Sequence, residues 1–145
     1  MYVTATQAQA EVSITVLHIK GELDASNYQI LIDKAGEAYA DGTRNVLLDL
    51  SEVPYMGSSG LVAFHSVALL MRGERPPDPE GGWGALRSID REREAGLQQH
   101  VKLLNPQPKV ERVLRMAGFD QFFEIFTDEK AAIASFSAGP VEATA

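Results

Sequence analysis

The chain has 145 residues, of which 45% are hydrophobic and 23% charged, and it contains no cysteine. This length suits one compact domain, and the lack of cysteine excludes disulfides, thiolate metal sites and cysteine nucleophiles. The formal net charge of −7 argues against non-specific nucleic-acid binding, because no excess of basic side chains is present to replace phosphate counterions. No apolar run is long enough to span a membrane, and residues 1–10 lack the basic and apolar regions of a signal peptide. We therefore expect a cytoplasmic protein.

Three segments of the first half of the chain have strand character. Residues 3–9 are a weak candidate that fits an edge position, whereas residues 14–20 are β-branched and alternate between two faces. Residues 45–50 form a short apolar run, which is typical of a strand buried on both faces in a largely parallel sheet. Helices are predicted between and after these strands.

The first predicted helix covers residues 26–40. Its apolar positions recur at helical spacing, and these are Leu31, Ala35, Ala38 and Tyr39. Asp24 or Ser26 can cap its start, and Gly42 can close it in a left-handed turn. After a loop at residues 51–60, a second helix is predicted from Ser58 or Ser59 to about Arg72. That helix is apolar nearly all round, which indicates either burial on several sides or an exposed apolar patch.

Residues 73–99 interrupt the pattern with a proline-, glycine- and acid-rich loop. A polar helix is predicted within it at residues 85–98, and Trp83 either covers a surface groove or contacts a partner. The remaining predicted elements are a strand at 100–104, a helix at 108–117 closed by Gly118, a strand at 122–126 and a helix at about 128–136 capped by Thr127. Residues 137–145 are expected to be a flexible tail.

The alternation of strands and helices predicts an α/β fold with a mostly parallel or mixed sheet of four to five strands and about four helices. The expected organisation is a single domain over residues 1–136 with an inserted loop at about 73–99. We find no internal repeat.

Two motifs are more specific than this fold class. The first is Gly21-Glu22-Leu23-Asp24, at the end of a strand and before a helix. The second runs from strand to loop to helix and reads DLSEVPYMGSSGL over residues 49–61. Together, at this spacing, they resemble the STAS domain family, whose bacterial members include the anti-sigma factor antagonists. The resemblance extends over about residues 12–136, apart from the insertion.

The resemblance implies a function in partner switching. In this family an anti-sigma factor that is also a serine kinase phosphorylates the antagonist at the start of the second helix. The unphosphorylated antagonist binds the kinase and frees the sigma factor, and a phosphatase resets the phosphorylated form. The implied phosphoacceptor is Ser58, with Ser59 as the alternative. The implied partner-binding residues are Asp24, Met56, Gly57, Ser58, Ser59, Gly60 and Leu61.

Gly57 departs from the family pattern, in which an aspartate precedes the phosphorylated serine. Its loss removes a charge and a side chain that can orient Ser58, so an altered phosphorylation rate or a constitutively unphosphorylated domain is a hypothesis. The location itself has physical support, because the N–H groups and dipole at a helix start tolerate a phosphate. The alternative interpretation is that Ser58 and Ser59 are ordinary N-caps, and that Asp24 is a helix cap as well as, or instead of, a partner contact.

No enzyme class is predicted, and no cofactor or metal site. His18, His65 and His100 lack ligand spacing and are interpreted as packing or surface residues. The Gly57–Gly60 turn does not match the glycine spacing of a hydrolase nucleophile elbow, and it lacks the lysine of a phosphate-binding loop. The competing function is a STAS domain that is not phosphorylated, either as a subunit of a transport assembly or as a small-ligand sensor.

Overall fold

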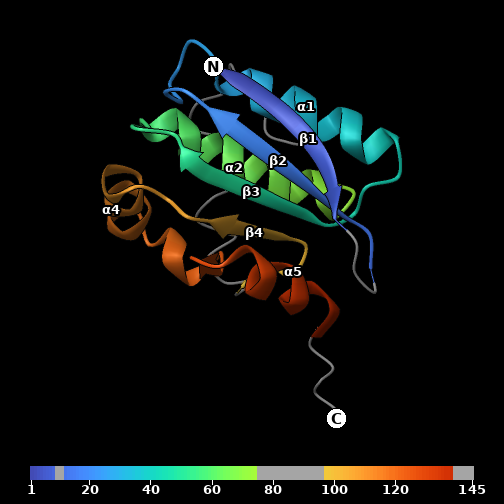
Figure 1. The fold of residues 1–145 in the computed structure, drawn as a ribbon. Helices are drawn as coiled ribbons and strands as arrows, with labels where there is room; N and C mark the ends of the chain where they lie inside the picture. Colours follow the sequence, from blue (N-terminus) through green and yellow to red (C-terminus); the bar gives the residue numbers. More distant parts are fainter. Residues whose placement is uncertain (9–11, 75–96, 139–145) are drawn as a thin grey trace.

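The computed structural model describes residues 1–8, 12–74 and 97–138. Their strands form one sheet in the order β1-β2-β3-β4-β5, with β1 antiparallel to β2 and all other neighbours parallel (Figure 1). The strands are β1 (Tyr2–Ala8), β2 (Ile14–Lys20), β3 (Val46–Glu52), β4 (Val101–Leu104) and β5 (Ile125–Phe126). The helices are α1 (Tyr28–Ala40), α2 (Ser58–Met71), α4 (Pro108–Met116) and α5 (Glu129–Ala138). The predicted α/β class with a mixed sheet is confirmed.

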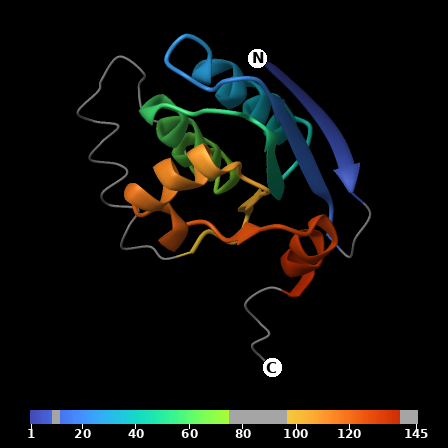
Figure 2. The ribbon, with the colours of Figure 1, turned by 60° about the vertical axis from the view of Figure 1, so that its left-hand side comes forward.

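Helices cover the two faces of the sheet unequally. α1, α2 and α4 lie on one face and α5 on the other (Figures 1 and 2). The β2 side chains divide as their alternation predicted, with Leu17 and Ile19 in the larger core and Ile14 and Val16 in the smaller core under α5. The molecule therefore has two hydrophobic cores separated by the sheet.

The central strand of the sheet, β3, has buried apolar side chains on both of its faces. In β3, the side chains of Val46, Leu47, Leu48 and Leu50 are fully buried, as the continuous apolar run predicted. α2 packs against α1 and the sheet, and its side chains from Ala63 to Leu69 are all buried. Of the two alternatives for this apolar helix, burial on several sides is therefore the correct one.

Three predicted boundaries are wrong for local reasons. α1 begins at Tyr28 and not at residue 26, because the backbone N–H of Asp24 bonds Asn27 Oδ1 at 3.0 Å and the intervening residues form turns. Asp128, not Thr127, accepts a bond from a free N–H of α5, that of Ala131, at 3.3 Å. Residues Ser137 and Ala138, expected in the tail, belong to α5.

The strand predicted at residues 122–126 is reduced to β5, Ile125–Phe126. Gly118 adopts a left-handed φ of 77° and starts a short 3₁₀ helix, Phe119–Gln121. Phe119, Phe122 and Phe123 then pack on one another, with ring centroids 5.0 Å apart for Phe119 and Phe122 and 5.8 Å apart for Phe119 and Phe123. These rings fill the larger core instead of alternating across a strand.

The prediction of a polar helix at residues 85–98 falls almost entirely outside the described residues, and so does Trp83. Leu97 and Gln98, which are described, are not helical. The tail beyond Ala138 is likewise outside the described part of the chain.

Candidate functional site

The two sequence motifs meet at one edge of the sheet. β2 and β3 are parallel neighbours, so the segments that follow them, residues 21–24 and 53–57, leave the sheet side by side. Backbone hydrogen bonds continue the ladder into these segments, from the N–H of Gly21 to the carbonyl of Glu52 at 3.0 Å and from that of Leu23 to Tyr55 at 3.1 Å. A third bond runs from the N–H of Gly57 to the carbonyl of Leu23 at 3.0 Å. We call this assembly the carboxyl edge.

Buried side chains anchor the carboxyl edge from within. Leu23 and Met56 are paired in an isolated parallel bridge, and both side chains are fully buried. Gly60, in the first turn of α2, lies directly against Met56, and a Cβ added there would overlap the Met56 side chain and stand 3.2 Å from Leu23 Cδ2. Gly60 is therefore required by close packing and not by an unusual backbone angle.

The first turn of α2 carries two hydroxyl groups, those of Ser58 and Ser59. Gly57 is the N-cap residue with extended backbone angles, φ −88° and ψ −177°, and α2 has no side-chain cap bond and no acidic residue in its first turn. The Ser58 side chain is exposed and that of Ser59 is half-buried. Because neither serine caps the helix, the interpretation of these residues as ordinary N-caps is wrong. A Cβ at Gly57 would meet no atom within 4 Å, so the backbone here does not require glycine for reasons of space.

Asp24 has a defined local role. Its Oδ1 accepts bonds from the Ser26 hydroxyl at 2.6 Å and from the Ser26 N–H at 2.9 Å, and its carbonyl accepts from the N–H of Tyr28 at 2.9 Å. The bond from the Ser26 hydroxyl, followed by that from the Ser26 N–H, lowers the pKa of the Asp24 carboxyl. Asp24 thus stays ionised while it holds the turn that leads into α1.

Not all of the predicted site residues are accessible. Met56 and Gly60 are buried, Asp24, Gly57, Ser59 and Leu61 are half-buried, and Ser58 is exposed. Sequence analysis did not select two exposed apolar side chains, Tyr55 and Ile30. Tyr55 lies in the carboxyl edge and Ile30 in the first turn of α1, and each is 47% exposed. Among the described residues, the large exposed apolar side chains of these segments thus belong to the loop and to α1, whereas Leu61 of α2 is only half-buried.

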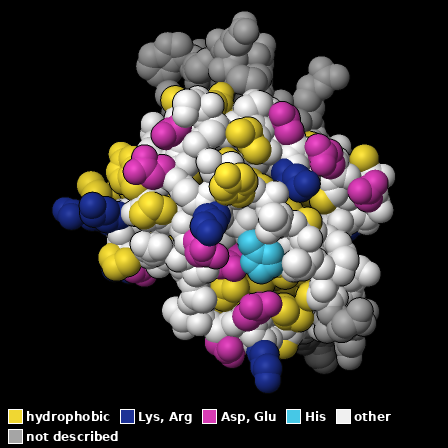
Figure 3. Space-filling view, turned by 45° about the horizontal axis from the view of Figure 1, so that its top comes forward, with side chains coloured by type: hydrophobic (Ala, Val, Ile, Leu, Met, Phe, Trp, Pro, Cys, Tyr) yellow, Lys and Arg dark blue, Asp and Glu magenta, His cyan; other side chains and the backbone are white. Residues whose placement is uncertain are grey.

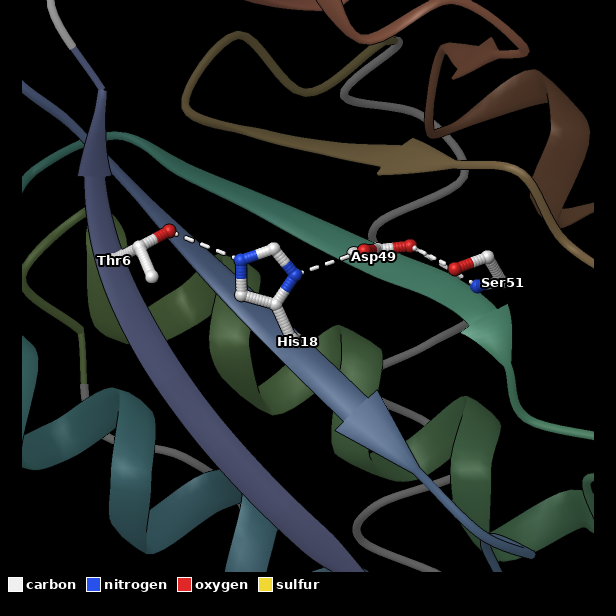
Figure 4. Close-up of polar contacts among 4 residues, drawn as sticks. All are labelled: Thr6, His18, Asp49 and Ser51. Atoms are coloured by element: carbon white, nitrogen blue, oxygen red, sulfur yellow. Dashed lines mark hydrogen bonds and ion pairs between the residues drawn. The ribbon is translucent and has the colours of Figure 1, made fainter.

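A polar cluster that sequence analysis missed lies on the face of β2 and β3 opposite α2 (Figure 4). His18 Nδ1 is 2.8 Å from Asp49 Oδ2, and its Nε2 is 3.0 Å from the Thr6 hydroxyl. Asp49 Oδ1 accepts bonds from the Ser51 hydroxyl at 2.8 Å and from the Ser51 N–H at 3.1 Å. The register of β2 and β3 places His18 beside Asp49, so parallel pairing of the two predicted strands was the signal that could have identified this pair.

The Asp49 carboxyl makes stability depend on pH. Burial raises its pKa, but bonds from the Ser51 N–H, His18 and the Ser51 hydroxyl outweigh burial, and the pKa lies below its ordinary value. A carboxyl of this kind stabilises the fold above its unfolded pKa of about 4, and that contribution is lost as the pH falls through the lower folded pKa. We therefore expect the stability advantage of the wild type over Asp49→Asn to shrink as the pH falls below about 4.

Urea unfolding at a series of pH values measures this difference. Asp120→Asn, at an exposed aspartate, is the control for the loss of one charge. A difference between wild type and Asp49→Asn that does not change with pH would contradict the assignment.

The face drawn in Figure 3 has a mixed surface. Acidic, basic and hydrophobic side chains are interspersed on the face seen in Figure 3, with no continuous basic stripe there. In residues 1–8, 12–74 and 97–138, no group of three or more histidine, cysteine, aspartate or glutamate side chains is placed to hold a metal ion. Within the same residues, no helix combines the length and apolar character of a membrane-crossing segment.

Solved structures share this fold across nearly the whole chain. TM1081, a candidate anti-sigma factor antagonist of Thermotoga maritima, is 19% identical, with a TM-score of 0.63 over 92% of this chain and 94% of its own. An anti-sigma factor antagonist of Mycobacterium paratuberculosis is 18% identical, with a TM-score of 0.61 over 94% of this chain and 95% of its own. SLC26A9 is 14% identical, with a TM-score of 0.53 over 98% of this chain but 24% of its own.

The search of curated proteins returned no match to the chain. Residues 5–73 match the family model of the STAS domain. This stretch contains both motifs and the whole carboxyl edge. Residues 5–73 are therefore similar to the STAS domain, and the described residues have the five-stranded mixed sheet and helix arrangement of that fold.

Proposed function

We propose that this STAS domain is an anti-sigma factor antagonist, a binding module whose docking to an anti-sigma factor with serine kinase activity is controlled by phosphorylation of Ser58. The observation that carries the proposal is the exposed Ser58 hydroxyl at the uncapped start of α2, held by two loops with bonded backbones. The names of the solved anti-sigma factor antagonists that share the fold support the same function.

The electrostatics of the carboxyl edge suit such a switch. The first turn of α2 has no acidic side chain and no side-chain cap, so its N–H groups and helix dipole favour a phosphate locally. Phosphorylation adds a charge of about −1.5 to −2 at this point. The added charge raises the desolvation cost of burying Ser58 beneath a partner, and it repels acidic side chains of that partner.

The unphosphorylated surface offers apolar contacts for the partner. Tyr55 and Ile30 are the large hydrophobic side chains exposed near the loop and the start of α1, and Leu61 adds half-buried area. We infer that the kinase docks over Ser58 and these side chains, frees its sigma factor, and is released when it has phosphorylated the serine. A serine phosphatase completes the cycle.

Ser58 is expected to be the phosphorylated residue, with Ser59 as the alternative, because Ser58 is exposed and Ser59 is half-buried. Incubating the chain with ATP and an extract of its source organism, followed by phosphopeptide mapping by mass spectrometry, measures this. We expect phosphate on Ser58, its loss in Ser58→Ala and its retention in Ser59→Ala.

Gly57→Asp provides a further arm of the experiment. A Cβ at this position would meet no atom within 4 Å, so the variant tests whether the missing aspartate sets the phosphorylation rate. An absence of phosphate on both Ser58 and Ser59, in the wild type and in Gly57→Asp alike, would contradict the phosphorylation-controlled function.

A second function is supported by two observations. Gly57 replaces the aspartate of the phosphorylated family members, and a pocket of about 480 Å³ opens beside α5, with Asn45, His100, Lys102, Glu124 and Ser135 in its wall. These favour a STAS domain that is not phosphorylated and that acts as a small-ligand sensor or as a subunit of a transport assembly. Co-purification with transport proteins, unaffected by ATP, would support this alternative over the first.

A further inference from the structure

The sheet has two very different edges. β5 is two residues long, whereas β1 is seven residues long and pairs with β2 at all seven positions without a bulge. Figure 2 shows β1 at the margin of the described molecule, and within the described residues no backbone hydrogen bond links it to an element other than β2. One side of its N–H and C=O groups is therefore available to another strand.

β1 also lacks the features by which natural proteins block an edge strand. Its sequence, YVTATQA, contains no charged residue, no proline and no glycine. Thr4, Ala5 and Thr6 are exposed in the middle of the strand, and Tyr2 is 72% exposed at its start. The edge is thus long and neutral.

We propose that β1 pairs with β1 of a second copy of this chain, antiparallel and about a two-fold axis, so that the two sheets become one. The chain has a net charge of −7, so two copies repel each other on average, and the uncharged β1 is a place where they can approach. An antiparallel pair of identical strands is self-complementary, as a two-fold interface requires.

The side chains of β1 fit a register centred on Ala5. In that register Ala5 faces Ala5 of the second copy, and the small side chains leave the axis unobstructed. Thr4 of each copy then faces Thr6 of the other, and threonine pairs across strands are favourable. The full length of β1 is paired, with Tyr2 opposite Ala8.

A single cysteine tests this geometry, because the wild-type chain contains none. Directly opposed residues of antiparallel strands have Cα atoms about 4.5–5.5 Å apart, within the range of about 4.4–6.8 Å that a disulfide spans. Under mild oxidation, we expect Ala5→Cys to form a covalent dimer much faster than Ala131→Cys, a matched change at an exposed alanine of α5. Non-reducing gels over time measure both rates.

Sedimentation equilibrium of the wild type is the companion measurement. The expected mass rises with concentration towards twice the 15.8 kDa of the chain. Ala5→Asp, which places two like charges at the axis, should remain monomeric, whereas Ala131→Asp, with the same net charge, should behave as the wild type. A wild type that is monomeric at every concentration, or equal crosslinking of the two cysteine variants, would overturn the proposal. β1 would then be available to pair with an extended segment of another protein. Neither result bears on Ser58, so this proposal and the proposed function fail separately.

Discussion

Replacing Ser58 by aspartate is expected to weaken binding of the proposed partner, an anti-sigma factor kinase, by about 5- to 150-fold, the usual range of coupling between two sites. The change puts a permanent carboxylate at the exposed start of α2, where the proposed docking surface is centred. Ser58→Ala keeps that surface uncharged and should bind as tightly as the wild type. Binding of each variant to the purified partner, measured by calorimetry, gives the ratio.

Neither substitution should unfold the domain. Ser58 makes no side-chain cap bond, so neither change removes an interaction within α2, and the aspartate can add a favourable interaction with the helix dipole; an unfolding midpoint no lower than that of the wild type is the control. Equal affinities of Ser58→Asp and Ser58→Ala would contradict the proposed control by charge at this residue. A loss of binding in both variants would indicate that the hydroxyl itself is a contact.

Gly60→Ala is expected to destabilise the domain, although replacing a helical glycine by alanine usually stabilises by about 0.5–1 kcal/mol. The new Cβ would overlap the fully buried Met56 side chain, and overpacking of a core typically costs about 1–3 kcal/mol. Gly36→Ala is the matched control, because Gly36 lies in α1 and its Cβ would meet no atom within 4 Å. The two changes should therefore shift the free energy of unfolding in opposite directions.

A double-mutant cycle with Met56→Ala isolates the cause. Shortening Met56 removes the two side-chain atoms that the new Cβ would overlap and leaves only Leu23 Cδ2 at 3.2 Å, so Gly60→Ala should lose most of its cost in that background. Urea unfolding of the four proteins measures the coupling. If Gly60→Ala stabilised the wild type, or cost the same with Met56 shortened, then Gly60 would not be required by packing against this side chain.

Much of the fold could be predicted from the sequence because local and global preferences agree. β2 occupies the predicted range of residues 14–20, where β-branched residues alternate between two buried faces. β3 was recognised as a central strand because it is apolar on both faces. β1 was a weaker candidate from its own composition. Its strand conformation depends on pairing with β2, and the sequence of β1 alone does not show that pairing.

The largest error, in the last strand, has its physical origin in tertiary packing. The aromatic run at residues 122–126 has high strand propensity, yet Gly118 turns the chain and the phenylalanine rings are used to fill the core. The position of Ser58 at the start of α2 was predictable from the motif. The burial of Met56 was not, because it depends on contacts with Leu23 and with the space left by Gly60.

The carboxyl edge is built without a hinge. Three backbone bonds join residues 21–24 to 52–57, and two buried side chains fix both segments from below. A phosphate placed on Ser58 would therefore meet a backbone that stays where it is, and both forms of the domain would offer a partner the same contour with a different charge. We therefore expect the partner to distinguish the phosphorylated from the unphosphorylated domain by charge. The difference should appear in the dissociation rate of the complex and not in a change of shape.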